Sequence, residues 1–161
     1  MREQSFLNAG VKIVLVDKRP GMEREEVLHY EGGIISFVEY LNSEKRGNPV
    51  HPQVIYMKGE RGNSIAEVAM QYNDSYNETI ISFANNMATI EGGTHETGFK
   101  VGITKSLNEY GKKYNLFKGD EKLTGDDVRE GLTAVISVKL KEAQVKELLL
   151  RGKTDIIKGE K

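Results

Sequence analysis

Residues 64–86 read SIAEVAMQYNDSYNETIISFANN, and the class of fold follows from this stretch. Its first part has the two-residue period of a strand. Ala66, Val68, Met70 and Tyr72 share one face of this strand. Residues 73–77 have the composition of a turn, and residues 79–84 form a second apolar run. The stretch therefore predicts strands of a sheet that is at least partly antiparallel.

The segments before this stretch predict a hairpin, a helix and another strand. Residues 12–17 are rich in β-branched side chains, close at Arg19-Pro20-Gly21 and are followed by an extended run at residues 27–30. Apolar residues then recur at helical spacing from Ile34 to Leu41. A further strand is expected at residues 54–57.

The segments after it predict a long helix and a last strand. Thr94 is the expected N-cap of the helix. One helix face carries Phe99, Ile103, Leu107, Tyr110 and Tyr114. Thr124 and Asp127 have the spacing of a capping box, and residues 132–140 alternate as a final strand. Together these elements predict one α/β domain with a mixed, largely antiparallel sheet and helices on one face.

Composition narrows the class of protein. The chain of 161 residues has 23 basic and 24 acidic residues, so it lacks the strong positive charge typical of many nucleic-acid-binding domains. It has no cysteine, which excludes thiol chemistry and disulfides. It also has no long apolar run and no signal peptide behind Met1. We expect a cytoplasmic protein that does not contact a membrane.

Familiar catalytic and metal-binding patterns are absent from the sequence. His29, His51 and His95 lack the spacing of metal ligands, and no Gly-x-Ser-x-Gly elbow occurs. Gly92-Gly93 before the long helix offers a weak phosphate-loop signal, although such a pair is more often a tight connection. The lysines of the long helix fit either a solvated face or a DNA surface, and periodicity leaves both interpretations open.

Several short segments are more specific than their periodicity, and they resemble one known family. They are His29-Tyr30-Glu31-Gly32-Gly33-Ile34, Gln71-Tyr72-Asn73-Asp74, Phe83-Ala84-Asn85-Asn86, Glu91-Gly92-Gly93-Thr94-His95 and the run from Asp127 to Val138. In order and spacing they resemble the second domain of the B subunits of bacterial type IIA DNA topoisomerases, gyrase and topoisomerase IV. The resemblance runs from about Phe6 to about Leu140.

This resemblance implies a function for residues 1–140. In the family the second domain is a transducer, which couples ATP binding and hydrolysis to DNA strand passage and contains a left-handed β-α-β crossover. The full-length family uses ATP and Mg²⁺, dimerises, and works with a gyrase A-type partner subunit on DNA. The chain is thus expected to be a fragment of an ATP-dependent isomerase. The alternative is a stand-alone α/β module that contacts RNA or a protein.

Residues 141–161 depart from the family pattern. The positions of the family's Gln-Thr-Lys loop, whose lysine reaches the γ-phosphate, fall on Leu148-Leu149-Leu150. Leucines supply neither a cation nor an amide donor. We therefore expect a divergent, loosely ordered tail, and no catalytic residue, metal ligand or bound cofactor in this chain.

Two lysines are the predicted DNA contacts. In the family the residue after the Gly-Phe pair is typically basic and lines the cavity that the transported duplex crosses, and here Gly98-Phe99 is followed by Lys100. Lys105 ranks second, because it lies about 140° further around the helix. The competing interpretation is that both are ordinary solvated lysines.

Overall fold

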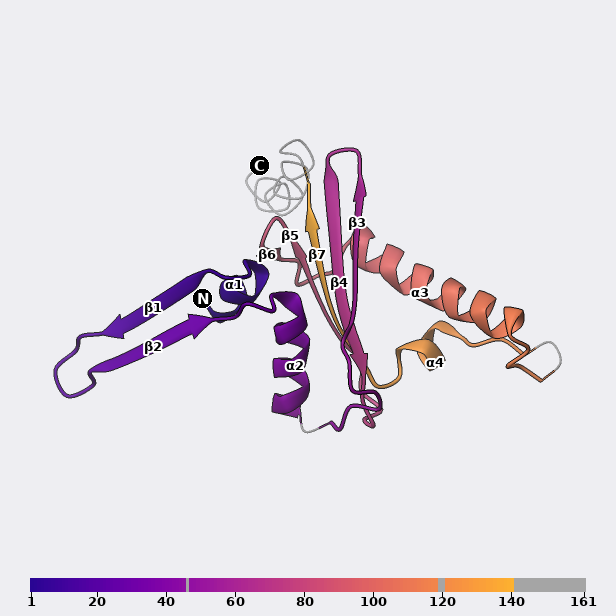
Figure 1. Cartoon of the computed structure of the whole chain (residues 1–161), viewed down its shortest axis with the longest axis horizontal. Coiled ribbons are helices and arrows are strands. Elements are labelled where there is room, and N and C mark those ends of the chain that lie inside the picture. The colour runs from indigo at the N-terminus through magenta and orange to yellow at the C-terminus, as the bar shows by residue number, and fades with distance from the viewer. Residues whose placement is uncertain (46, 119–120, 141–161) are drawn as a thin grey trace, which may run out of the picture.

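The computed structural model describes residues 1–45, 47–118 and 121–140 (Figure 1). Their helices and strands are α1 (Arg2–Leu7), β1 (Lys12–Asp17), β2 (Arg24–His29), α2 (Ile34–Lys45), β3 (Ile55–Arg61), β4 (Ser64–Tyr72), β5 (Thr79–Ala84), β6 (Met87–Ala88), α3 (Thr94–Lys113), α4 (Gly125–Arg129) and β7 (Leu132–Lys139). β1 and β2 form a separate hairpin, and the other strands form one sheet in the order β3-β4-β7-β5-β6. The predicted tail, including Leu148-Leu149-Leu150, lies outside the described residues.

The sheet is mixed and largely antiparallel, as predicted. β4 pairs antiparallel with both β3 and β7, whereas β5 runs parallel to β7. The parallel pair is joined through α3 and α4, where the family resemblance implies a crossover. Every residue of β7 from Leu132 to Val138 is buried. A strand buried at consecutive positions must be covered on both faces.

The prediction that the helices share one face of the sheet is wrong. Ala69 and Val135 pack in one cluster with α1 and α2, whereas their neighbours Met70 and Ala134 pack in another with α3 and α4. Adjacent residues of a strand point to opposite faces. The sheet is therefore the middle of three layers, and Figure 1 shows α2 and α3 on its two sides.

The β1–β2 hairpin projects from the domain as an arm that is held at its base (Figure 1). The base is organised by α1, which the sequence patterns did not predict. The Phe6 ring lies between the rings of Tyr30 and Phe37, with centroid distances of 3.8 Å and 4.6 Å. Farther out, Val14 and Val27 form a cross-strand pair that stays about half exposed.

Helix α3 packs on the sheet through its inner half, the part that contains Phe99, Ile103 and Leu107, and not through its outer half. Ile103 is buried and Phe99 and Leu107 pack against the same cluster, but Tyr110 and Tyr114 are 55% and 52% exposed. The apolar stripe predicted for this helix thus continues past the sheet that covers it. The N-cap is Gly93 rather than Thr94, while the capping box of Thr124 and Asp127 is confirmed.

None of the helices in the described parts of the chain has the length and apolar character needed to cross a membrane.

Candidate nucleic-acid interface on the long helix

Lys100, the first predicted DNA contact, is held by two carboxylates. Its Nζ lies 2.9 Å from Oε1 of Glu78, which precedes β5, and 3.1 Å from Oε1 of Glu96, one helical turn earlier in α3. The Lys100 side chain is 31% exposed. The ammonium group is thus part of a partly buried ion-pair network.

The network continues to α4 and to the sheet. Oε2 of Glu78 accepts a hydrogen bond of 2.9 Å from Arg129, which also donates one of 2.6 Å to Asp126. Oε2 of Glu96 accepts a hydrogen bond of 2.7 Å from the Ser82 hydroxyl on β5. Glu78 therefore bridges two cations, and the network ties the inner half of α3 to its neighbours.

The pKa values of these groups show which interactions prevail. Burial raises the pKa of Glu78, but hydrogen bonds from Lys100 and Arg129 outweigh burial and lower it. Burial likewise raises the pKa of Glu96, and hydrogen bonds from Ser82 and Lys100 lower it overall. The hydrogen bond to Glu78 is the main reason why the pKa of Lys100 is raised. All three groups are thus charged at neutral pH, and Lys100 and Arg129 together offset the charges of Glu78 and Glu96.

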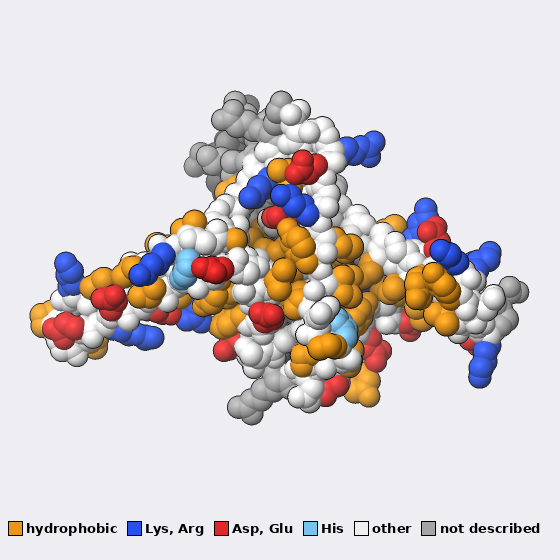
Figure 2. All heavy atoms as spheres, in the orientation of Figure 1, with side chains coloured by type: hydrophobic (Ala, Val, Ile, Leu, Met, Phe, Trp, Pro, Cys, Tyr) orange, Lys and Arg blue, Asp and Glu red, His pale blue; other side chains and the backbone are white. Residues whose placement is uncertain are grey.

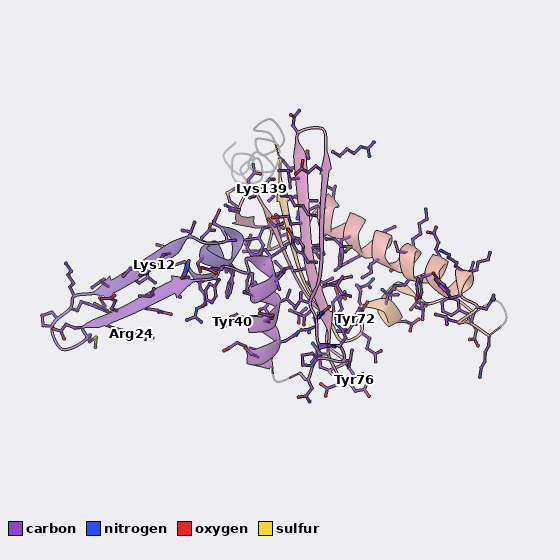
Figure 3. All side chains as sticks on the ribbon, in the orientation of Figure 1. Lys12, Arg24, Tyr40, Tyr72, Tyr76 and Lys139 are labelled. Atoms are coloured by element: carbon purple, nitrogen blue, oxygen red, sulfur yellow. The ribbon has the colours of Figure 1, made fainter. Side chains whose placement is uncertain are left out.

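The surface beside Lys100 is acidic. A shallow hollow there is lined by the carboxylates of Glu78, Asp126, Asp127 and Glu130, with Arg129 as its one cation. Tyr72, which is labelled in Figure 3, links β4 to α4, because its hydroxyl donates a 2.8 Å hydrogen bond to the Val128 carbonyl. A phosphate approaching Lys100 from this side would meet an excess of negative charge.

Lys105, the second predicted contact, lies in a different setting. Its side chain is 74% exposed, and its nearest carboxylate oxygen, on Glu109, is 3.8 Å away. It lines a cleft of about 440 Å³ together with Lys112 and Lys122. Figure 2 shows Lys and Arg side chains standing out around this end of α3. The structure thus favours Lys105 over Lys100 as a contact for an anion.

The cleft is formed because the loop after α3 folds back onto the helix. The side-chain amide of Asn108 makes two hydrogen bonds of 2.9 Å to the backbone of Leu123. The Leu116 N–H donates to the Gly111 carbonyl at 2.8 Å, and the Phe117 ring fills the space where any residue other than glycine at position 111 would place its Cβ. These contacts fix the side of the cleft opposite α3.

The other candidate sites of the sequence find little support. No group of three or more potential metal ligands occurs in residues 1–45, 47–118 and 121–140. His95 is half-buried, and burial lowers its pKa; its Nε2 lies 3.1 Å from the Thr89 hydroxyl. Gly92 would place a Cβ 3.4 Å from a carboxylate oxygen of Glu96, so a phosphate at this helix start would face a negative charge.

Sequence reasoning missed Glu78 and Lys122. Glu78 lies 22 positions before Lys100, so no local spacing reveals their contact. Lys122 belongs to a loop whose return onto α3 depends on tertiary contacts. The pairing of Glu96 with Lys100 could have been found, because residues four apart on a helix are neighbours.

Comparisons with known proteins agree with the motifs. A family model described as DNA gyrase B matches residues 33–150. The chain is 52% identical to the DNA gyrase B subunit of Streptococcus pyogenes serotype M3, over 98% of this chain and 24% of the relative. It is 51% identical to the DNA gyrase B subunit of Enterococcus faecalis, over 89% of this chain and 22% of the relative. The Streptococcus alignment extends past Leu140, so similarity does not stop where the predicted tail begins.

Solved structures show the same relationship. The 43K ATPase domain of Thermus thermophilus gyrase B matches with a TM-score of 0.77 at 37% identity, over 88% of this chain and 38% of that one. The gyrase B subunit of Myxococcus xanthus has the same fold, with a TM-score of 0.72 at 22% identity. This chain spans about a quarter of the length of the curated relatives it matches. On the family model and these identities, the chain belongs to the DNA gyrase B family.

Proposed function

We propose that this chain is the transducer segment of a gyrase B-type subunit, which couples ATP binding and hydrolysis to the passage of one DNA duplex through another. The observation that carries the proposal is the 52% identity to a gyrase B protein over nearly the whole chain. The chain covers only 24% of that relative, and we propose that the ATPase and DNA-cleavage steps belong to segments outside it.

The architecture suits a part that transmits movement. α2 and α3 cover opposite faces of one sheet, and the Glu78 network links α3 to α4 and to the start of β5. Such a unit can move as a rigid body, because paired charges and packed faces resist deformation. It would pass a displacement on one side of the sheet to the other.

Carboxylates beside the two candidate anion positions argue against a nucleotide site in the described residues. The glycine pair at the start of α3 lies beside the Glu96 carboxylate, and the cleft near Lys105 also contains Glu109 and Glu121. We therefore propose that ATP and Mg²⁺ are held by other segments of the full-length protein. The partners that the proposal implies are DNA, a gyrase A-type protein and a second copy of the gyrase B-type protein, in the cytoplasm.

A chimera tests this function. Residues 1–140 would replace the matching segment of the Streptococcus pyogenes gyrase B protein, and ATP-dependent supercoiling would be measured with the gyrase A protein of the same organism. We expect supercoiling within about tenfold of the parent, because half of the residues are already identical. A folded chimera that hydrolyses ATP but does not supercoil DNA would contradict the transducer role.

A second chimera, carrying residues 1–161, tests the tail. Leu148, Leu149 and Leu150 lack the donors that a phosphate-contacting loop requires. We expect ATP hydrolysis slower than in the first chimera by about tenfold or more. Equal rates in the two chimeras would show that the tail retains the function of the family's loop.

A further inference from the structure

We infer that the two-residue turn Asn85-Asn86 mechanically links the two ends of this domain, and that both asparagines are positioning residues for the coupling of ATP hydrolysis to DNA passage. This inference rests on the proposed function. Under that proposal, the segments that hold ATP and cleave DNA lie outside residues 1–140. Their covalent connections to the domain therefore run through α1 at one end and Leu140 at the other.

The backbone of the turn does not by itself require two amide side chains. The turn closes the hairpin of β5 and β6, where Ala84 pairs with Met87. Asn85 and Asn86 both have positive φ, of 48° and 63°. Two-residue turns of this kind favour Asn, Asp and Gly, and glycine is preferred at the second position. The two asparagine side chains are therefore expected to have a further role.

Asn85 holds the end of β7. Its Nδ2 donates a hydrogen bond of 3.0 Å to the Leu140 carbonyl, and its Oδ1 accepts one of 2.7 Å from the Leu140 N–H. Its own backbone N–H donates to the Val138 carbonyl at 2.8 Å. The side-chain amide thus takes the place of a peptide group of a neighbouring strand, because it offers the same donor and acceptor. It extends the pairing of β7 as far as Leu140.

Asn86 holds α1 through a closed ring of three hydrogen bonds. Asn86 Nδ2 donates to Asn8 Oδ1 at 2.9 Å, and Asn8 Nδ2 donates to the Gln4 carbonyl at 2.8 Å. Gln4 Nε2 donates to the Asn86 carbonyl at 2.7 Å, which closes the ring. Figure 1 shows α1 beside β6. α1 is held in turn to the hairpin arm, because Arg2 donates a 2.7 Å hydrogen bond to Glu26 on β2.

These hydrogen bonds suit the transmission of movement better than the apolar packing around them. α1 also packs on the sheet through Phe6 and Leu7, in a cluster with Phe83 and Val135. Apolar attraction is non-directional, whereas hydrogen bonds restrict both distance and angle. Because the two asparagines are adjacent, a displacement of α1 is passed to Leu140 through a single turn.

Glycine variants separate the side chains from the turn. Asn85→Gly and Asn86→Gly remove the side-chain hydrogen bonds, and glycine adopts a positive φ without strain, so the turn itself should persist. Asn115→Gly is the matched control. Asn115 is exposed and has a positive φ of 52°, and its side chain makes no hydrogen bond within the described residues.

Hydrogen exchange at the Leu140 amide tests the contact at the end of β7. In the 161-residue chain, Asn85→Gly should speed this exchange by about tenfold, because the N–H loses its acceptor. Asn115→Gly should leave it within about twofold of the parent. Equal exchange in the parent and Asn85→Gly would contradict the link.

The 1–140 chimera tests the effect on function, through the rate of ATP hydrolysis and the supercoils introduced per ATP. Each asparagine variant should lower the supercoils per ATP by about fivefold or more, with ATP hydrolysis within about twofold of the unsubstituted chimera. The double variant should lose no more than the single variants, because the two side chains act in series. Asn115→Gly should change neither quantity.

Four results in the chimera would overturn the inference. They are unchanged supercoils per ATP in either asparagine variant, parallel losses of hydrolysis and supercoiling, an equal loss in Asn115→Gly, and losses that multiply in the double variant. If the unsubstituted chimera supercoils DNA and the asparagine variants match it, this inference alone fails. If the unsubstituted chimera hydrolyses ATP without supercoiling, the proposed function is wrong.

Discussion

The inner and outer halves of α3 use the same residue type in opposite ways. Lys100, in the inner half, binds two carboxylates and is 31% exposed, whereas Lys105, in the outer half, is 74% exposed and only loosely paired. The two residues are five positions apart on one helix. Their difference teaches that the partners a fold brings to a lysine, more than its position on a helix, decide whether it stabilises the protein or remains free for a ligand.

The two halves of α3 differ because the sheet ends beneath the helix and covers its inner half. The inner half of α3 packs over β5 and β7 and meets Glu78 and Arg129 there, while the outer half extends beyond the sheet and contacts the loop that follows the helix. Substitutions that respond differently in the two halves can therefore break or sharpen this comparison.

The largest expected effect comes from a matched pair of glycines. Gly131 precedes β7 with a φ of +69°, and a Cβ there would lie 2.7 Å from the Ser75 carbonyl oxygen, which is backbone. We expect Gly131→Ala to destabilise the domain by about 3 kcal/mol. Gly111→Ala meets only the movable Phe117 ring, so it should reduce stability by about 1 kcal/mol and loosen the loop.

Chemical denaturation of both variants measures this difference. Equal losses of stability in the two variants would show that the outer loop is as firmly integrated as the sheet, contrary to the comparison.

The next effect concerns Glu96, whose side chain is 19% exposed. Glu96→Gln keeps a hydrogen-bond acceptor for Ser82 but removes one of the two negative charges beside Lys100. We expect a loss of about 1 kcal/mol at neutral pH. The matched change in the outer half, Glu109→Gln, should have almost no effect on stability, because that pair is exposed and 3.8 Å apart.

The dependence on pH distinguishes a charge effect from a packing effect. The folded protein lowers the pKa of Glu96 below its ordinary value of 4.5. A carboxyl group with a lowered pKa contributes stability above about pH 4.5, and this contribution is lost as the pH falls through the folded-state value. The difference in unfolding free energy between the parent and Glu96→Gln should therefore shrink below about pH 4.5. A difference that stays constant down to about pH 3 would assign the loss to packing.

The smallest expected effect is a gain in binding. Glu109→Gln removes a negative charge from the cleft that contains Lys105, so duplex affinity at low salt should rise about threefold. Titration of a labelled duplex measures it, with Glu60→Gln beside Lys58 as the control. Weaker binding would mean that Glu109 positions Lys105 for the contact.

Local patterns predicted much of the fold. The alternation at Ala66, Val68, Met70 and Tyr72 placed these residues on one face correctly, and the Thr124–Asp127 spacing predicted a real capping box. Helix α1 was missed because six residues at a chain end carry too little periodicity. Alternation also says which residues share a face, but not which helix covers it, and so α2 and α3 were wrongly placed together.

The candidate site was less accessible to sequence reasoning. Lys100 lies about 100° around α3 from Phe99, which suggested that its side chain could reach solvent. Glu78 comes from a distant segment and meets Lys100 and Arg129 only in the folded domain. Lys122 reaches the cleft through a loop whose return onto α3 depends on the hydrogen bonds between Asn108 and the Leu123 backbone, 15 residues apart. Both features depend on tertiary contacts that no short window of sequence contains.

The most direct test of the division between the two halves of α3 is a side-by-side comparison of Lys100→Ala and Lys105→Ala, with thermal unfolding and salt-dependent duplex binding measured on each. The account predicts that Lys100→Ala lowers the melting temperature by about 3 °C and leaves the slope of log affinity against log salt unchanged. It predicts that Lys105→Ala leaves the melting temperature within about 1 °C and lowers the slope by about 1. The reverse pattern, with a reduced slope in Lys100→Ala and a reduced melting temperature in Lys105→Ala, would contradict it.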